Sequence, residues 1–147
     1  MLFNQTDVNE LIQRINNLKP DSEKKWGKMT VSQMLAHNCK GLETTLGRHH
    51  IPRVFIGRIL GPFFRNMAIG DKPFAKNSPT DKSLIFSGEY DFESERKKLI
   101  ELIETLLKGG AQACTKEPHA FFGHLTPDEW AIFQWKHLDH HLRQFGV

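Results

Sequence analysis

Cysteines and long apolar runs are both scarce in this sequence, and each scarcity excludes a class of protein. Of 147 residues only Cys39 and Cys114 are cysteines, and they form neither a CxxC pair nor a zinc-finger spacing. The longest apolar stretch, around residues 54–67, is interrupted by two arginines and a proline. It is too short and too charged to span a bilayer. A disulfide framework and a membrane-spanning protein are therefore not expected.

A targeting signal and a strong charge imbalance are also missing. The first residues, Met1 to Gln5, lack the basic and then apolar pattern of a secretory signal, so we expect a cytoplasmic protein with free thiols. The net charge is only +3, with lysines and arginines scattered along the chain. Without a basic patch or a helix-turn-helix pattern, we expect no nucleic-acid partner and no membrane partner. The length and composition fit one soluble domain over residues 1–147.

Apolar residues recur at helical spacing in several segments, and cap signals mark their starts. Four substantial helices, one short extra helix and few strand signals predict an all-α four-helix bundle, in which ligand sites are built from inward-facing side chains. Residues 70–82 are predicted to be a loop, and Ser83–Tyr90 fits either a brief strand or a loop. The predicted helices are a first one capped by Thr6, a second from the capping box of Thr30 and Gln33 to about Leu46, a short one over residues 52–64, a fourth over Phe92–Leu107, and a last one from Thr126-Pro127 almost to Val147.

The short helix has two interpretations, because it is apolar and carries isolated arginines. It can cover the bundle with its arginines reaching out to solvent. It can instead form a dimer contact or lie on a membrane surface. We favour the cover, since isolated basic residues fall short of the strongly charged face that surface-binding helices use.

The last helix places two of its histidines on its apolar stripe. On a helical wheel, His137 and His141 align with Trp130 and Gln134, whereas His140 falls among the charged residues. Burying an imidazole costs free energy unless its nitrogens find partners. Residues four apart share a helix face, so both rings can bind one divalent cation. Two core histidines bonded to carbonyl groups are the alternative, and the His-Glu-x-x-His motif of zinc proteases is absent.

Two ligands hold a metal poorly, so a third should come from elsewhere. His37 lies in the middle of a predicted helix, but at the flank of its apolar arc. Periodicity therefore leaves the third ligand open. The candidates are His37, His49, His50, His119, His124 and several carboxylates.

Two stretches of the sequence add a family resemblance over nearly the whole chain. They are Met34–Cys39, around a helix-borne histidine, and His119–Trp130 running into His137–Gly146. The chain resembles the DinB superfamily of bacterial four-helix metalloproteins, and is most similar to a branch known only as a domain of unknown function.

The resemblance implies a ligand set. In that superfamily one histidine comes from the second helix and two from a His-x-x-x-His on the last, which here are His37, His137 and His141. His140 matches an extra histidine that is usually not a ligand. The superfamily often reads His-His-Arg-Gly-Gln at this point. Here the arginine is displaced by one position and the glycine is missing, which puts a substrate role for Arg143 in doubt.

Three neutral histidines leave open positions on the metal, a form typical of catalytic sites. The donor set suits zinc or nickel best, and iron or manganese as well. Some proteins of similar fold use bacillithiol, mycothiol or glutathione as cosubstrates, which implies a thiol-dependent transferase acting on a small molecule. A metal-dependent hydrolase and a non-enzymatic metal- or ligand-binding protein, with His119 or a carboxylate as fourth ligand, are the alternatives. Related bundles often form homodimers. We expect the pocket to be lined by Trp130, Gln134, His119 and His124.

Overall fold

The computed structural model describes residues 1–76 and 86–147, and the regular structure of these residues is helical. The predicted all-α class is therefore confirmed. Of the undecided segment Ser83–Tyr90, residues 83–85 lie outside the described residues, and residues 86–90 form no strand. The helices are α1 (Gln5–Asn16), α2 (Val31–Thr45), α3 (Phe55–Ile69), α4 (Phe92–Gly109), the 3-10 turn η2 (Gly110–Ala113) and α5 (Pro127–Gln144).

Reciprocal caps fix the starts of the two helices that carry the candidate ligands. At α2, the Thr30 hydroxyl accepts the amide of Gln33, and the Gln33 side chain accepts the amide of Thr30. Thr126 and Glu129 form the same capping box at α5, where Pro127 occupies the first turn. Each box satisfies two amides that a helix start leaves without partners. Both predicted starts are confirmed.

The start of α1 differs from the prediction. The capping side chain is Asn4, whose Oδ1 accepts the amide of Asp7 at 3.0 Å, and Thr6 already lies inside the helix. Asparagine ranks above threonine at this position, so the earlier residue takes the cap.

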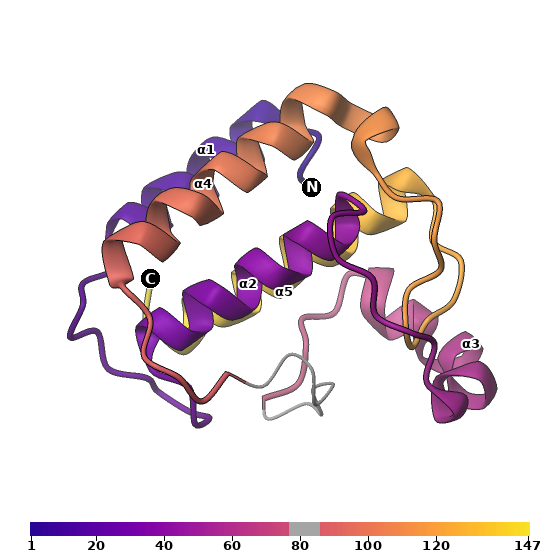
Figure 1. Ribbon diagram of the computed structural model, residues 1–147, viewed down its shortest axis with the longest axis horizontal. Coiled ribbons are helices and arrows are strands. Elements are labelled where there is room, and N and C mark those ends of the chain that lie inside the picture. Colours follow the sequence, from indigo (N-terminus) through magenta and orange to yellow (C-terminus); the bar gives the residue numbers. More distant parts are fainter. Residues whose placement is uncertain (77–85) are drawn as a thin grey trace.

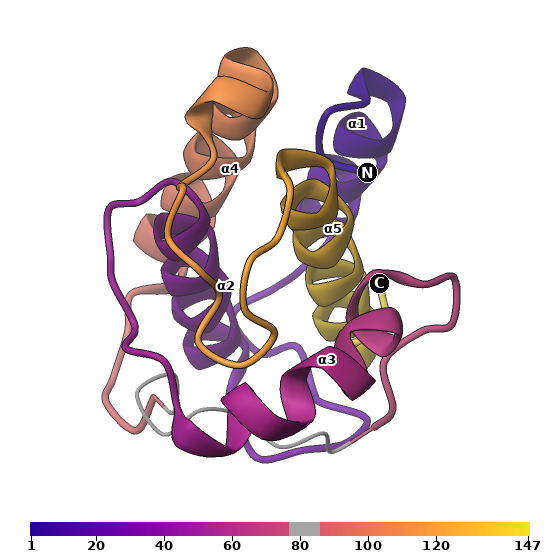
Figure 2. The same cartoon turned by 90° about the vertical axis from the view of Figure 1, so that its right-hand side faces the viewer.

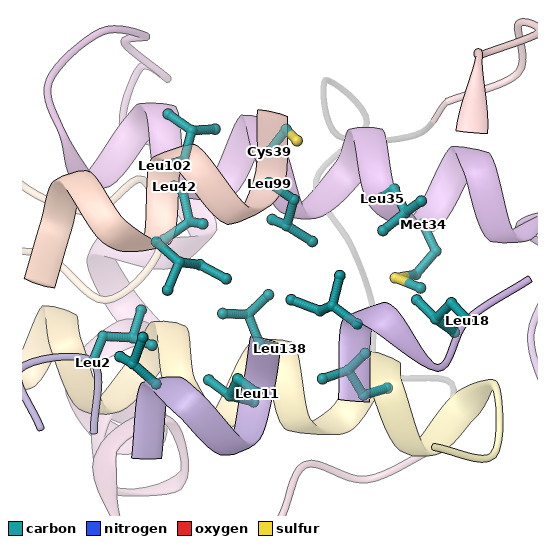
Figure 3. Close-up of a cluster of buried hydrophobic side chains, with 14 of the residues drawn as sticks. Leu2, Leu11, Leu18, Met34, Leu35, Cys39, Leu42, Leu99, Leu102 and Leu138 are labelled. Atoms are coloured by element: carbon teal, nitrogen blue, oxygen red, sulfur yellow. The ribbon is translucent and has the colours of Figure 1, made fainter. Parts of the chain in front are cut away.

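The helices α1, α4, α2 and α5 form a closed ring in which each helix packs against the next. Figures 1 and 2 show α1 beside α4 and α2 beside α5. Each helix contributes a fully buried leucine to the centre of the ring, as Leu11, Leu35, Leu99 and Leu138 do (Figure 3). Burying one leucine stabilises the fold by about 1.5–3 kcal/mol, so this shared core holds the four helices in register.

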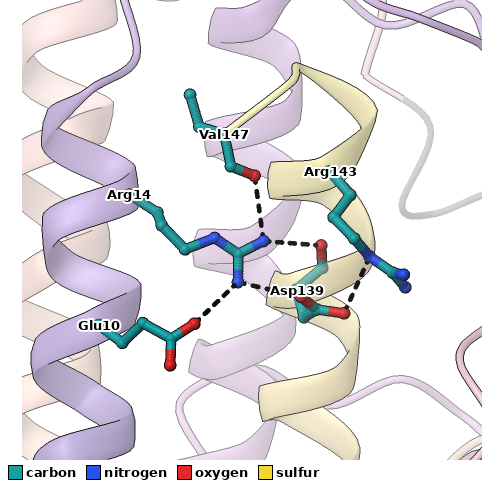
Figure 4. A network of polar contacts seen from close by, with 5 residues as sticks. All are labelled: Glu10, Arg14, Asp139, Arg143 and Val147. Carbon is teal, nitrogen blue, oxygen red and sulfur yellow. Dashed lines mark hydrogen bonds and ion pairs between the residues drawn. The ribbon is translucent and has the colours of Figure 1, made fainter.

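A polar network ties the second half of α5 to α1. Arg14 donates to the Asp139 carboxylate at 3.0 Å and to the Val147 carbonyl at 3.1 Å (Figure 4). The other carboxylate oxygen of Asp139 pairs with Arg143 Nε at 3.1 Å. Because Asp139 lies between residues 137 and 141, this network fixes the rotation of the turn that carries both histidines.

The helix α3 packs against α5 on the outside of the ring (Figure 2). It is longer than predicted, and the face turned to the protein is made of small residues. A Cβ atom on Gly57 or Gly61 would lie within 2.7 and 2.1 Å of the Phe121 backbone. The helix therefore covers part of the bundle, as expected, but with its glycines rather than with its large apolar side chains.

Polar contacts anchor α3 to α5. Arg65 was expected to reach into solvent, but it donates to both carboxylate oxygens of Glu129 at 2.5 and 2.6 Å. Lys136 Nζ donates to the carbonyl oxygens of Met67 and Gly70 at the end of α3. In the part of the chain that the structure describes, no helix is long and apolar enough to cross a membrane.

Candidate metal centre

Three histidines from two helices meet where α2 lies against α5. His37 Nε2 is 2.9 Å from His137 Nε2, and the centroid of the His141 ring is 4.8 Å from that of His37 and 4.7 Å from that of His137. One nitrogen from each ring lies within 4.8 Å of the other two. Within residues 1–76 and 86–147, this is the one group of three or more His, Cys, Asp or Glu side chains close enough to hold a metal ion.

The position of His37 follows from the ring arrangement of the bundle. Its side chain is only 1% exposed, although the wheel placed it at the flank of the apolar arc of α2. Because α2 packs against both α4 and α5, its buried surface is wider than one apolar stripe. Gln134 of α5 donates to Gly41 O at 3.0 Å and to Thr45 Oγ1 at 2.8 Å. These bonds hold α2 and α5 together on the C-terminal side of His37.

A glutamine determines which nitrogen of His141 is available to a ligand. Gln144 Nε2 donates to the Trp26 carbonyl at 2.7 Å, and a carbonyl can only accept. The glutamine oxygen, Oε1, therefore faces His141 Nδ1 at 2.8 Å and accepts a hydrogen bond from its N–H group. With the proton on Nδ1, Nε2 of His141 carries the lone pair that can bind a metal.

The surroundings keep the rings of His137 and His141 neutral. Burial lowers the pKa of His137 well below its usual range, and the neighbouring rings of His141 and His37 lower it further. Burial, together with the His37 ring, lowers the pKa of His141 to about 3. Neutral imidazole is the form that binds metals, so His137 and His141 are ready to do so at physiological pH.

Aromatic rings surround the triad. The Phe133 ring lies parallel to that of His137 with the centroids 5.9 Å apart, and Phe86 meets His37 edge-on at 6.2 Å. His119 packs edge-on against Phe133 at 5.0 Å and stacks on Phe122 at 4.7 Å. These rings form an apolar wall beside the triad.

The four side chains expected to line a pocket lie in different settings. Trp130 and Gln134 are buried on the inner face of α5. Trp130 also lines a hollow of about 40 Å³ shared with His49 and His50. His119 is half-buried within the aromatic wall, whereas His124 is exposed.

The hydrogen bonds of His119 argue against its use as a fourth ligand. Its Nδ1 accepts the amides of Phe121 and Phe122 at 3.1 and 3.2 Å. A neutral ring then carries its proton on Nε2, so neither nitrogen offers a lone pair to a metal.

The wheel misplaced His140 of α5. His140 was expected among the charged residues, yet it is buried, with its ring against those of Trp26 and Phe74. Lys136 is buried too, with Nζ bonded to backbone carbonyls and 4.9 Å from the centroid of the Phe74 ring. Burial lowers the pKa of both groups. The segments around residues 26 and 74 cover this face of α5, which no periodicity within α5 could reveal.

The cysteines of this chain are poor sources of a thiolate. Cys39 is buried and its thiol donates to the Glu95 carbonyl. Burial, with the nearby Glu95 carboxylate, raises the pKa of Cys39 far above its usual range, and burial raises that of Cys114 to about 11. These contacts make Cys39 a residue of the hydrophobic core.

The fold and this cluster define an all-α bundle with a triad of two buried histidines and one half-buried histidine that could form a metal site. The chain belongs to the family described as protein of unknown function (DUF1569), which matches residues 2–146. Neither the curated proteins nor the solved structures contain a significant match to it.

Proposed function

We propose that this protein binds one divalent metal ion through His37, His137 and His141. The observation that carries the proposal is the set of three imidazole nitrogens within 4.8 Å of one another. Nitrogens held about 2.0–2.1 Å from one tetrahedral ion lie roughly 3.3 Å apart. The 2.9 Å separation of the His37 and His137 nitrogens is close to that value, and the three nitrogens would move closer together than 4.8 Å when an ion binds. This donor set suits zinc or nickel first, and iron or manganese as well.

The number of available ligands favours an open site. Among the described residues no fourth His, Cys, Asp or Glu joins the cluster, and His119 is engaged with its own turn. Three-histidine sites with free positions are typically catalytic. A metal bound there would supply Lewis-acid chemistry, polarising an oxygen or lowering the pKa of a bound water or thiol.

For the reaction we favour a thiol-dependent transferase acting on a small molecule. The basis is the resemblance to DinB proteins, and the cosubstrate would be a small thiol such as bacillithiol, mycothiol or glutathione. The raised pKa values of Cys39 and Cys114 favour an external thiol over the chain's own cysteines, because both cysteines hold their protons tightly. In this scheme Gln144 orients the His141 ring, and the ring of Phe133 shields His137 from water.

The first test is the metal content of untagged protein by mass spectrometry. We expect about one ion per chain in the wild type and almost none in the His137→Ala, His141→Ala double variant. A His49→Ala, His50→Ala double variant removes as many histidines outside the triad and should keep its metal. If the wild type neither carries metal nor takes up zinc or nickel, the proposal fails.

The second test separates the possible reactions once metal is bound. A transferase turns over an electrophile only when a small thiol is added, whereas a hydrolase needs none. Loss of the fold on chelation, without any turnover, would instead identify a structural metal.

A further inference from the structure

The helix α3 presents a continuous apolar stripe to the outside of the protein. Its side chains recur in pairs every four residues, which places them on one side of the helix. The two most exposed, Phe55 and Phe63, are 77% and 80% accessible. The exposed large apolar residues of α3 are Phe55, Ile56, Ile59, Leu60, Phe63, Phe64 and Met67.

This stripe is the reverse of an ordinary amphipathic surface helix, which turns its large apolar residues inward. Gly57, Gly61 and Ala68 are the buried residues of α3, and the first two press on the backbone of Phe121. Rolling the helix over would push large side chains into that backbone. The close contacts of the two glycines and the ion pair between Arg65 and Glu129 therefore hold the stripe on the outside of the protein.

The stripe is large enough for a stable protein contact. If a fully exposed side chain of this size offers about 200 Å², the seven exposed fractions amount to roughly 800 Å². The largest apolar patch on a typical monomer is about 300–600 Å². A standard interface buries about 800 Å² per partner, which is close to the whole exposed area of the stripe.

The chemistry of the stripe indicates the occupant. Its seven residues include three phenylalanines and a methionine and no charged side chain, as in the centre of a protein interface. A membrane-surface helix needs a strongly basic face instead. In α3 the side chain of Arg65 is paired with Glu129, so Arg58 is the one exposed basic residue of this helix. We propose that a second copy of this chain covers the stripe, with α3 packed against α3.

The spacing also predicts how the two helices meet. Ile59, Phe63 and Met67 form one ridge with four-residue spacing, and Ile56, Leu60 and Phe64 form another. Ridges of this kind pack into each other at about −50°. In a twofold pair the middle of the stripe lies near the axis, so Phe63 would contact the same stripe of the other copy. No charge opposes a like charge in this arrangement. The contact is independent of the metal, since none of the three histidines belongs to α3.

Sedimentation velocity of the full chain across the micromolar range tests the proposal. We expect wild-type protein to sediment at twice its chain mass of 17.0 kDa. Phe63→Glu should raise the dimer dissociation constant at least about 30-fold, the loss typical of a central hot-spot residue. Because Phe63 is exposed in the single chain, the Phe63→Glu variant should have the same helical circular dichroism as the wild type. Gln112→Glu adds the same charge at an exposed site outside α3 and should remain dimeric.

Three outcomes would overturn the proposal. Wild-type protein that stays monomeric has no second copy on the stripe. A dimer that Phe63→Glu leaves intact uses another surface. Monomeric protein that floats with vesicles of phosphatidylcholine and phosphatidylserine, and loses this property in Phe63→Glu, uses the stripe for a membrane instead.

Discussion

The side chain of Gln144 offers the sharpest test of how the triad is prepared for a metal. It is buried and makes two hydrogen bonds, one from His141 Nδ1 to its oxygen and one from its nitrogen to the Trp26 carbonyl. Replacing it with methionine keeps a similar volume but removes the acceptor. The Nδ1 proton of His141 then either stays buried without a partner or moves to Nε2, where it blocks the ligand lone pair.

Both consequences have similar magnitudes. A buried donor left without a partner costs about 1–3 kcal/mol. Changing the residue that orients a histidine ligand typically costs about 10–100-fold in metal affinity, or about 1.4–2.7 kcal/mol. We therefore expect Gln144→Met to bind zinc about 10–100-fold more weakly than the wild type while keeping its helical content.

Competition with a chromophoric chelator at neutral pH measures this affinity. The matched variant is Gln144→Glu, which keeps an acceptor for His141 but loses the donor to the Trp26 carbonyl. It should bind zinc at least as tightly as the wild type, because a carboxylate makes the imidazole a stronger ligand. Equal affinities for the wild type and Gln144→Met would refute the role of Gln144. Equal losses of zinc affinity in both variants would instead assign the effect to the lost hydrogen bond with the Trp26 carbonyl.

Two further predictions concern stability. The pKa of His141 is lowered to about 3 from 6.5, so the unfolded chain binds more protons than the folded one within that range. The metal-free protein should therefore lose stability as the pH falls from about 6.5 towards 3, and this group contributes up to about 1.4 kcal/mol per pH unit. A free energy of unfolding in urea that stays constant across this pH range would contradict the prediction. Gly61→Ala should destabilise by about 1–3 kcal/mol, since the new Cβ would lie 2.1 Å from the Phe121 carbonyl oxygen. Gly41→Ala, also in a helix but with neighbours no closer than 3.4 Å, should be nearly neutral or stabilising in the same denaturation assay, and equal losses in the two variants would contradict the steric argument.

Local signals in the sequence were sufficient for the helices and for part of the site. The capping box at Thr30 and the helix start at Thr126 depend on neighbouring residues, so both could be predicted directly. The side shared by His137 and His141 follows from the period of a single helix. His37 needed the family resemblance, because its burial depends on two neighbouring helices that periodicity does not describe.

The features that escaped prediction depend on long-range packing. His140 and Lys136 are covered by the segments around residues 26 and 74, far away in sequence. The outward stripe of α3 depends on the close approach of Gly57 and Gly61 to Phe121. Gln144 had a usable signal, since it lies three residues after His141 and on the same face, where a buried glutamine needs a partner.

The order of the three candidate ligands along the chain has a consequence for biosynthesis. His37 and His137 meet across a sequence separation of 100 residues, and the Arg14 bond that steadies α5 spans 125. At roughly 5–20 residues per second, the ribosome makes the last histidine about 5–20 s after the first. A nascent chain without α5 offers a metal one ligand of the three. The proposed metal site can therefore form only when α5 has been made and has docked, so an ion bound there would stabilise chains that contain a docked α5 and not shorter ones.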